Sequence, residues 1–304
     1  MAEQGKNSRI LSDIRLLKTS LSLVMRKRII EDKPRYPKVN ELFEKLFYYK
    51  VTAKSRKENI NAFYFDEETL EKYIFTDDLL INQLQRLCPS VCNSFDIKFF
   101  EEFKHLSSDI DKILPIQFVG HKMANRENDE LLIVCGDLLR NSTNTVIAAT
   151  QTLRCGFRLQ SGILLRTSIE ICATVVHLLT QPDKLNNFRA NKLESTKSIS
   201  VANKQIPLYG KVWGLLSQKF IHIGSFHTDY YPLDEYSEKE EIPAKVTLGM
   251  LGFATLILAI TTELTFINVT KESKYWVPIG NHKYKFIPPD NSQMVWAEKL
   301  LRNT

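Results

Sequence analysis

Apolar side chains recur at intervals of three and four residues along most of the chain, which is the period of an α-helix with one buried face. The amphipathic segments with this pattern are residues 9–30, 39–49, 76–87 and 95–106. Two further segments, residues 153–180 and 242–269, are apolar on almost every side. A helix that is apolar all round belongs in the centre of a protein or in a membrane. We therefore expect an all-α fold, a helical bundle assembled around these two segments.

The helical pattern stops near the C-terminal end of the chain. Apolar and polar residues alternate there in two short runs, Trp276–Ile279 and Lys283–Ile287, as in strands with one buried face. Gly280 and Asn281 lie between the runs and suit a tight turn. The sequence thus predicts a small C-terminal β-hairpin near residues 275–288.

A break in the helical pattern also occurs near Pro115, since proline removes a backbone hydrogen bond from a helix. We place a domain boundary here, between an N-terminal helical region, residues 1–115, and a C-terminal helical bundle domain, residues 116–304. Within the N-terminal region we expect a loop or a frayed helical end over residues 50–61. We expect a helix to start at Asp66, whose carboxylate is suited to cap it.

Four polar side chains interrupt the apolar segment at residues 153–180: Arg158, Arg166, Glu170 and His177. Arg166 and Glu170 are four residues apart and share one face of a helix, and His177 returns to nearly the same face. An unpaired charge in apolar surroundings costs several kcal/mol. We therefore expect an Arg166–Glu170 ion pair whose further partners come from a neighbouring helix.

The segment at residues 208–227 is the obvious supplier, because it carries an apolar stripe together with several polar side chains. If it packs against the central helix, Glu170 meets His222 or Tyr209. Two interpretations are open: a structural network that fixes the register of the helices, and a functional cleft. For the cleft, the catalytic candidates are Arg166, Glu170 and His222. The binding candidates are His177, Tyr209, Ser217 and Lys219.

Composition narrows the function classes. A net charge of +6 over 304 residues is mildly basic, and it permits contact with nucleic acid without requiring it. Neither a glycine-rich phosphate loop nor a G-x-S-x-G nucleophile motif occurs in the sequence. These absences argue against P-loop NTPases and serine hydrolases of the nucleophile-elbow type. We expect a protein partner or a homodimer.

Cysteine usage and hydropathy bear on the compartment. Five scattered cysteines argue against a disulfide framework and for a reducing, cytoplasmic setting. Cys88 and Cys92 form a C-x3-C pair, but no second pair follows at zinc-ribbon spacing, so we expect no metal site and no other cofactor. Val246–Thr262 is uncharged but short for a bilayer and rich in threonine. We expect it to be a buried core helix rather than a membrane span.

One resemblance involves the same polar residues. The pattern Gly162-x-x-Leu165-Arg166-x-x-x-Glu170 is followed by Leu208-Tyr209 and by Ser217-x-x-x-x-His222. Together they resemble a set of uncharacterised bacterial all-helical proteins that is similar to the HEPN-like four-helix proteins of abortive-infection and toxin–antitoxin loci. The resemblance covers roughly residues 125–270 and leaves the first third of the chain outside it. It implies a helical fold and a place in a bacterial defence or mobile-element locus.

The chain departs from the nuclease members of that superfamily, which carry an arginine followed by a histidine five to seven residues later. None of the six histidines has an arginine at those offsets, and Lys98 before His105 is the one basic residue there. Lysine holds a phosphate less specifically than the forked arginine side chain. We therefore expect a non-enzymatic helical interaction or regulatory protein. The alternative is a HEPN-like ribonuclease with His222 as general acid or base and with Arg166 or Lys219 as the phosphate contact.

Overall fold

The structure is a computed structural model, and it describes residues 60–65, 72–76, 79–224, 227, 233, 235–236, 242–270, 272–280 and 283–289. The chain divides into two compact units, Met1–Asp77 and Asp78–Thr304. The helices predicted at residues 9–30 and 39–49 lie outside the described residues.

In the first unit, the described residues form a two-stranded antiparallel sheet. Strand β1 (Ile60–Phe65) pairs with strand β2 (Lys72–Thr76), with Phe63 opposite Ile74. The end of the loop expected over residues 50–61 is therefore a strand, and the helix expected from Asp66 is replaced by β2 where the chain is described. Aromatic and β-branched residues dominate both strands, and these residue types favour extended backbone over helix.

Where it is described, the second unit consists of helices and their connecting segments, followed by a C-terminal hairpin. Its helices are α3 (Leu79–Asn82), the π-helical η1 (Gln83–Leu87), α4 (Cys88–Lys98), α5 (Phe100–Glu127), α6 (Glu130–Arg154), α7 (Gln160–Thr180), the 3-10 turn η2 (Pro182–Lys184), α8 (Leu185–Arg189), α9 (Ser195–Gln205), α10 (Leu208–Leu216), the π-helical η3 (Ser217–Ile221) and α11 (Ile242–Thr265). The predicted all-α class, a helical bundle with a small C-terminal β-hairpin, is confirmed.

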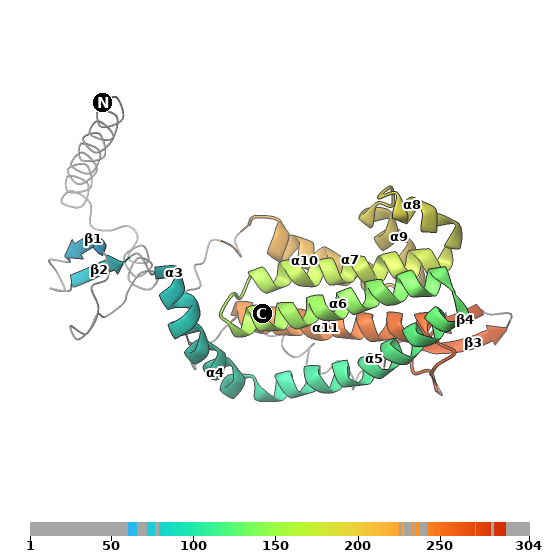
Figure 1. Cartoon of the computed structure of the whole chain (residues 1–304), viewed down its shortest axis with the longest axis horizontal. Helices are drawn as coiled ribbons and strands as arrows, with labels where there is room; N and C mark the ends of the chain where they lie inside the picture. The colour runs from blue at the N-terminus through green and yellow to red at the C-terminus, as the bar shows by residue number, and fades with distance from the viewer. Residues whose placement is uncertain are drawn as a thin grey trace, which may run out of the picture. The chain divides into compact units, whose positions relative to one another are not determined.

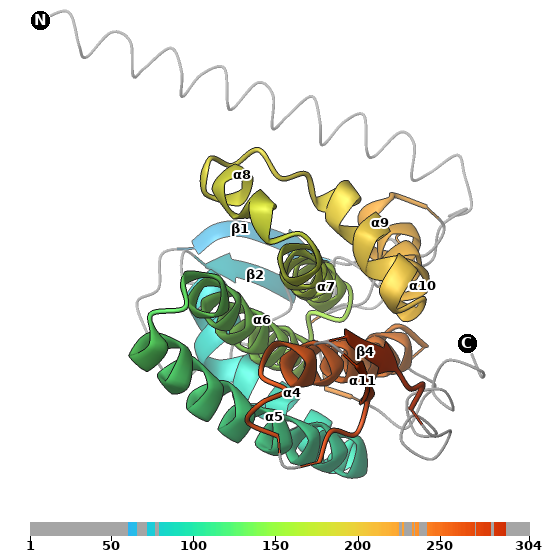
Figure 2. The same ribbon diagram turned by 90° about the vertical axis from the view of Figure 1, so that its right-hand side faces the viewer.

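Three long helices form the centre of this unit. Helices α6, α7 and α11 lie side by side, with α5 along α6 and α11, and with α9 and α10 against α7 (Figures 1 and 2). The side chains of Leu165, Ile169, Leu251 and Leu258 have no exposed surface. The two segments that are apolar on almost every side thus supply α7 and α11, and the amphipathic helices cover them.

The apolar segment at residues 153–180 is two elements rather than one helix. Helix α6 ends at Arg154, and α7 begins at Gln160. Gly156 lies between them with φ of +92°, a left-handed conformation that glycine adopts without the penalty a side chain brings. Arg158 therefore belongs to the turn, where its buried guanidinium lies 4.2 Å from the centre of the Tyr236 ring. One of the four polar residues is thus not part of the α7 stripe.

Helix α5 runs without a break through Pro115, which we expected to mark a domain boundary. The division between the compact units falls instead between Asp77 and Asp78. Helix α5 ends at Glu127, and its C-cap residue Asn128 has a left-handed φ of 55°. Asp129 then caps α6, because its Oδ1 accepts a hydrogen bond from the backbone N–H of Leu132 at 3.0 Å.

The C-terminal hairpin has the predicted position. Strand β3 (Trp276–Gly280) pairs with β4 (Lys283–Phe286) in antiparallel register. Trp276 is buried, and its Nε1–H donates to the carbonyl of Ile260 on α11 at 2.9 Å. The hairpin is therefore anchored on the end of a core helix.

Two of the described helices, α7 and α11, are long and apolar enough to cross a membrane by length and composition. More than half of each apolar window is buried inside the second unit. Within this unit, the segment expected to be a core helix, Val246–Thr262, packs against α5, α6, α7 and α10.

Candidate functional site

The predicted Arg166–Glu170 ion pair is confirmed. Arg166 Nη2 lies 3.1 Å from Glu170 Oε1, and the two side chains are 29% and 24% exposed. Trp213 on α10 completes the cluster. Its Nε1–H donates to the same carboxylate oxygen at 2.9 Å, while the Arg166 guanidinium lies 5.1 Å from the centre of its ring. The partner supplied by the neighbouring helix is therefore an indole, which offers one N–H donor and an aromatic face to the cation.

Helices α7 and α10 run antiparallel, and this orientation determines which residues meet. Trp213 contacts Glu170, whereas Phe220 packs on Gly162, where a Cβ atom would come within 2.2 Å of the Phe220 ring. Gly162 precedes Glu170 by eight residues, or about 12 Å along the helix axis. His222 follows Phe220 and is exposed, so it lies toward the start of α7 rather than beside Glu170.

The other candidates on this segment are held in separate places. Tyr209 is fully buried and shares a 2.5 Å hydrogen bond with Thr261 on α11, and burial raises the pKa of its hydroxyl well above the usual range. The Ser217 hydroxyl donates to the carbonyl of Trp213 at 2.8 Å. Lys219 is exposed on η3. The expected contact of Glu170 with Tyr209 or His222 is thus replaced by the contact with Trp213.

His177 also has a local partner. It is buried on α7, with its Nδ1 3.1 Å from the Ser198 hydroxyl on α9. Glu170 and His177 share one face of α7, as predicted, but α10 covers the first and α9 covers the second. The candidate residues therefore divide among several contacts and do not line one cleft.

Sequence reasoning missed Trp213 as a polar partner, although its position carried a signal. Trp213 is four residues after Tyr209 and four before Ser217, so it lies on the same face of its helix as both. It belongs to the apolar stripe that we predicted for this segment. An indole belongs to such a stripe and still has one N–H donor that needs an acceptor when it is buried.

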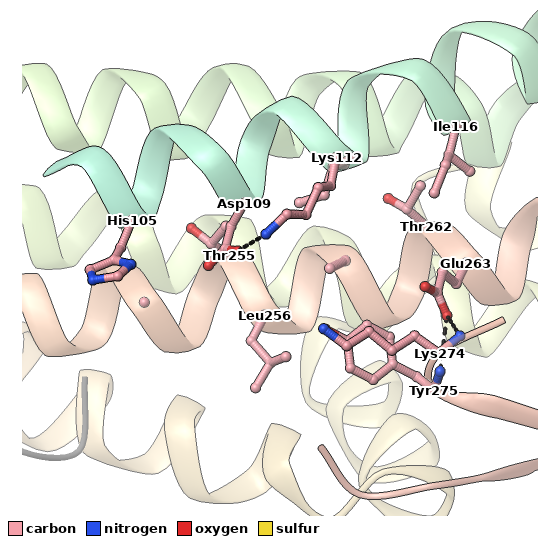
Figure 3. Close-up of a pocket in the computed structure, with 13 residues that line it drawn as sticks. His105, Asp109, Lys112, Ile116, Thr255, Leu256, Thr262, Glu263, Lys274 and Tyr275 are labelled. Atoms are coloured by element: carbon pink, nitrogen blue, oxygen red, sulfur yellow. Dashed lines mark hydrogen bonds and ion pairs between the residues drawn. The ribbon is translucent and has the colours of Figure 1, made fainter. Parts of the chain in front are cut away.

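A second candidate is a cavity of about 240 Å³ between α5, α11 and the segment that leads into β3. Figure 3 shows His105, Asp109 and Lys112 reaching it from α5, and Glu263, Lys274 and Tyr275 from the other wall. Its apolar wall includes Ile116 and Leu256. Sequence analysis did not find this cavity, because its charged residues look like the solvent-facing side of an amphipathic helix.

The charged groups of the cavity have structural partners. Glu263 Oε2 accepts hydrogen bonds from the Ser273 hydroxyl and from the backbone N–H groups of Lys274 and Tyr275, each at 3.0 Å. Asp109 pairs with Lys112 at 3.1 Å. Burial, with Glu263 and Asp109 nearby, raises the pKa of the Tyr275 hydroxyl. The carboxylates of Glu263 and Asp109 are thus occupied by hydrogen bonds and an ion pair within the protein.

Cysteines supply the third group of functional side chains. Among the described residues, Cys88, Cys92 and Cys155 bring three sulfur atoms within 4.8 Å of one another, and none of the three lines the cavity. No family model, curated protein or solved structure matches the chain.

Proposed function

We propose that the protein is a non-enzymatic helical interaction protein and that its partner is a second copy of the same chain, bound through the outer face of α5. One observation carries the proposal. Phe118 is 70% exposed on this helix, and Leu114 and Val119 beside it are 43% and 42% exposed. Large apolar groups gathered on a solvent-facing stripe are typical of an interaction surface.

The stripe points directly away from the core. Successive residues of an α-helix are rotated by about 100°, so the exposed residues at 111, 114, 115, 118, 119 and 122 share one side of α5. The buried residues of the helix are Leu106, Ile113, Gln117, Gly120 and Ala124, and they occupy the opposite side. We call the six exposed positions the outer stripe.

Its charges make the outer stripe complementary to itself. Asp111 lies at one end, Lys122 at the other, and the apolar residues lie between them. When two copies of α5 pack antiparallel about a two-fold axis between residues 116 and 117, Asp111 faces Lys122 of the other copy, and Leu114 faces Val119. A two-fold dimer needs a surface that matches itself in this way. The opposite charges at mirrored positions therefore favour a second copy as the occupant.

The non-enzymatic part of the proposal is supported by the arrangement of the predicted catalytic residues. Arg166 extends over Trp213 toward Glu170, whereas His222 lies near the opposite end of the α7–α10 contact. A general acid or base must come within hydrogen-bond reach of the group it serves. Arg166 and His222 are not arranged around a shared phosphate position.

Charge reversal tests the dimer. Asp111→Lys places lysines opposite each other at both ends of the paired helices, and like charges at an interface suppress association. We expect analytical ultracentrifugation to show a dimer for the native chain, a monomer for Asp111→Lys, and a dimer again for Asp111→Lys with Lys122→Asp. Glu194→Lys is the matched control, because it makes the same change of charge at an exposed pair on α9. A native chain that is monomeric at all concentrations, or a double variant that stays monomeric, contradicts the proposal.

The absence of catalysis is tested separately. Purified protein is incubated with a mixed RNA pool beside the His222→Ala variant, and the RNA lengths are compared. We expect both samples to leave the RNA unchanged. Cleavage by the native chain that is lost in His222→Ala would establish the ribonuclease alternative instead.

A further inference from the structure

Three cysteines from distant parts of the chain meet where α4 approaches the end of α6. Cys88 begins α4, Cys92 follows one turn later on the same face, and Cys155 is the residue after α6. The Sγ atoms of Cys88 and Cys92 are 3.8 Å apart, and those of Cys92 and Cys155 are 3.6 Å apart. All five cysteines of the chain are free thiols, but the other two, Cys135 and Cys172, lie outside this cluster.

The spacing of the sulfur atoms fits a metal ion. Four-coordinate Zn²⁺ binds thiolate sulfur at about 2.3 Å, and two thiolates of such a tetrahedron are about 3.8 Å apart. A disulfide needs a sulfur separation of about 2.05 Å, so any pair in the cluster would have to approach much further and would leave the third thiol unused. The geometry therefore suits one shared ion better than one covalent bond.

The surroundings orient the thiols and leave the cluster partly open to solvent. Gln151 Nε2–H donates to Cys155 Sγ at 3.2 Å, which is the kind of outer hydrogen bond that orients a metal ligand. Arg154, next to Cys155, is held by Asp96 through two hydrogen bonds of 2.7 and 2.5 Å. Cys92 is buried, while Cys88 and Cys155 are half-buried, so the cluster is partly accessible to solvent.

Both helix ends that carry the thiols are fixed in place. The backbone N–H of Cys155 donates to the carbonyl of Gln151 at 3.0 Å, and that of Gly156 donates to Leu153 at 2.8 Å. Tyr236 joins the two elements, because its backbone N–H donates to the Ser94 hydroxyl on α4 at 2.8 Å and its own hydroxyl donates to the Leu153 carbonyl. Ligands on rigid elements keep a metal site in its binding geometry.

We propose that Cys88, Cys92 and Cys155 bind one Zn²⁺ ion, with water in the fourth position on the solvent side. Three Zn–S bonds form, and the three S–H protons pass to solvent. Soft thiolate ligands select zinc over the hard cations magnesium and calcium. The fourth position distinguishes this site from the closed four-ligand sites of zinc ribbons.

Titration with Co²⁺ tests the site, because cobalt replaces zinc and shows thiolate-to-metal absorption bands. The full chain is reduced with a phosphine, freed of metal and titrated with Co²⁺ and then Zn²⁺. We expect the bands to saturate at one Co²⁺ per chain and to vanish when Zn²⁺ is added. Cys155→Ser and Cys88→Ser should each weaken binding at least tenfold, while Cys135→Ala, which changes a buried cysteine outside the cluster, should bind as the native chain does.

Melting curves separate loss of the site from loss of the fold. Zn²⁺ should raise the Tm of the native chain and of Cys135→Ala, and it should leave the Tm of a folded Cys155→Ser unchanged, because a ligand stabilises only the form that binds it. Three outcomes would overturn the proposal: no cobalt bands for the native chain, equal binding by Cys155→Ser, or a Cys92–Cys155 disulfide that persists under the reducing conditions.

Discussion

An amphipathic helix has apolar side chains toward the core and polar side chains toward solvent. Helices α7 and α5 depart from this pattern in opposite ways. Helix α7 carries Arg166, Glu170 and His177 in an apolar segment, and in the structure each has a partner from the same unit. Helix α5 carries Phe118 and Leu114 on its solvent side, where both stay exposed. The charges in an apolar helix were the conspicuous feature of the sequence, but their ion pair and ring contact lie within the unit. The apolar residues of the outer stripe on α5 have no such contact within the described part of the unit.

The largest difference between the two helices is expected when a leucine of each is replaced by alanine. Leu165 on α7 has no exposed surface, whereas Leu114 on α5 is 43% exposed. Leu165→Ala should lower the free energy of unfolding by about 2–5 kcal/mol, because it removes buried surface and leaves a cavity. Leu114→Ala should change the free energy of unfolding of the monomer by about 0.5 kcal/mol or less, since surface changes rarely exceed that. Urea unfolding followed by circular dichroism measures both, and similar losses would remove the distinction between the helices.

A smaller effect is expected from the ion pair of α7. Glu170→Ala leaves the half-buried Arg166 without its carboxylate and Trp213 Nε1–H without its acceptor, which should cost about 1–3 kcal/mol. The control is Lys197→Ala, which breaks the exposed Lys197–Glu194 pair on α9. An exposed pair contributes about 0.2–1 kcal/mol. If the two variants melt at the same temperature, the cluster with Trp213 does not stabilise the α7–α10 contact.

The smallest change in stability is expected on α5. Phe118→Ser removes the most exposed of the three large hydrophobic residues in the outer stripe and should change the free energy of unfolding of the monomer by about 0.5 kcal/mol or less. The same substitution should shift the dimer toward monomer in sedimentation velocity. Ile147→Ser, at an exposed residue of α6, is the matched control and should leave the association unchanged. If Phe118→Ser lowers the free energy of unfolding and leaves the dimer intact, Phe118 stabilises the monomer and not the dimer contact.

Much of the fold could be predicted from periodicity alone. The two all-apolar segments became α7 and α11, and the strands at residues 276–280 and 283–286 lie where alternation placed them. The break at Gly156 was missed, because apolar residues continue through it and a lone glycine does not by itself indicate a turn. Strands β1 and β2 were missed because charged residues around them suggested a loop and a capped helix.

The candidate site was predictable only within a single helix. The Arg166–Glu170 pair follows from a spacing of four residues, which is local information. Glu170 contacts Trp213 rather than Tyr209 or His222 because of the position of α10 along the axis of α7. The close packing of Phe220 on Gly162 determines that position. Likewise, Cys92 and Cys155 are 63 residues apart in the chain. A metal site was not expected, because only cysteines at short spacings in the sequence indicate one without the fold.

The hydrogen bonds of the Glu263 carboxylate bear on the order in which parts of the second unit fold and locally unfold. A two-stranded hairpin is at best marginally stable by itself in water. Here the loop before it is tied by Glu263 Oε2 to α11, and Trp276 is tied to the same helix. The backbone amide hydrogens of Lys274 and Tyr275 can exchange with solvent only when their hydrogen bonds to this carboxylate break. These loop amides should therefore be protected from hydrogen exchange about as long as the C-terminal turn of α11, and the hairpin should form after that helix has docked.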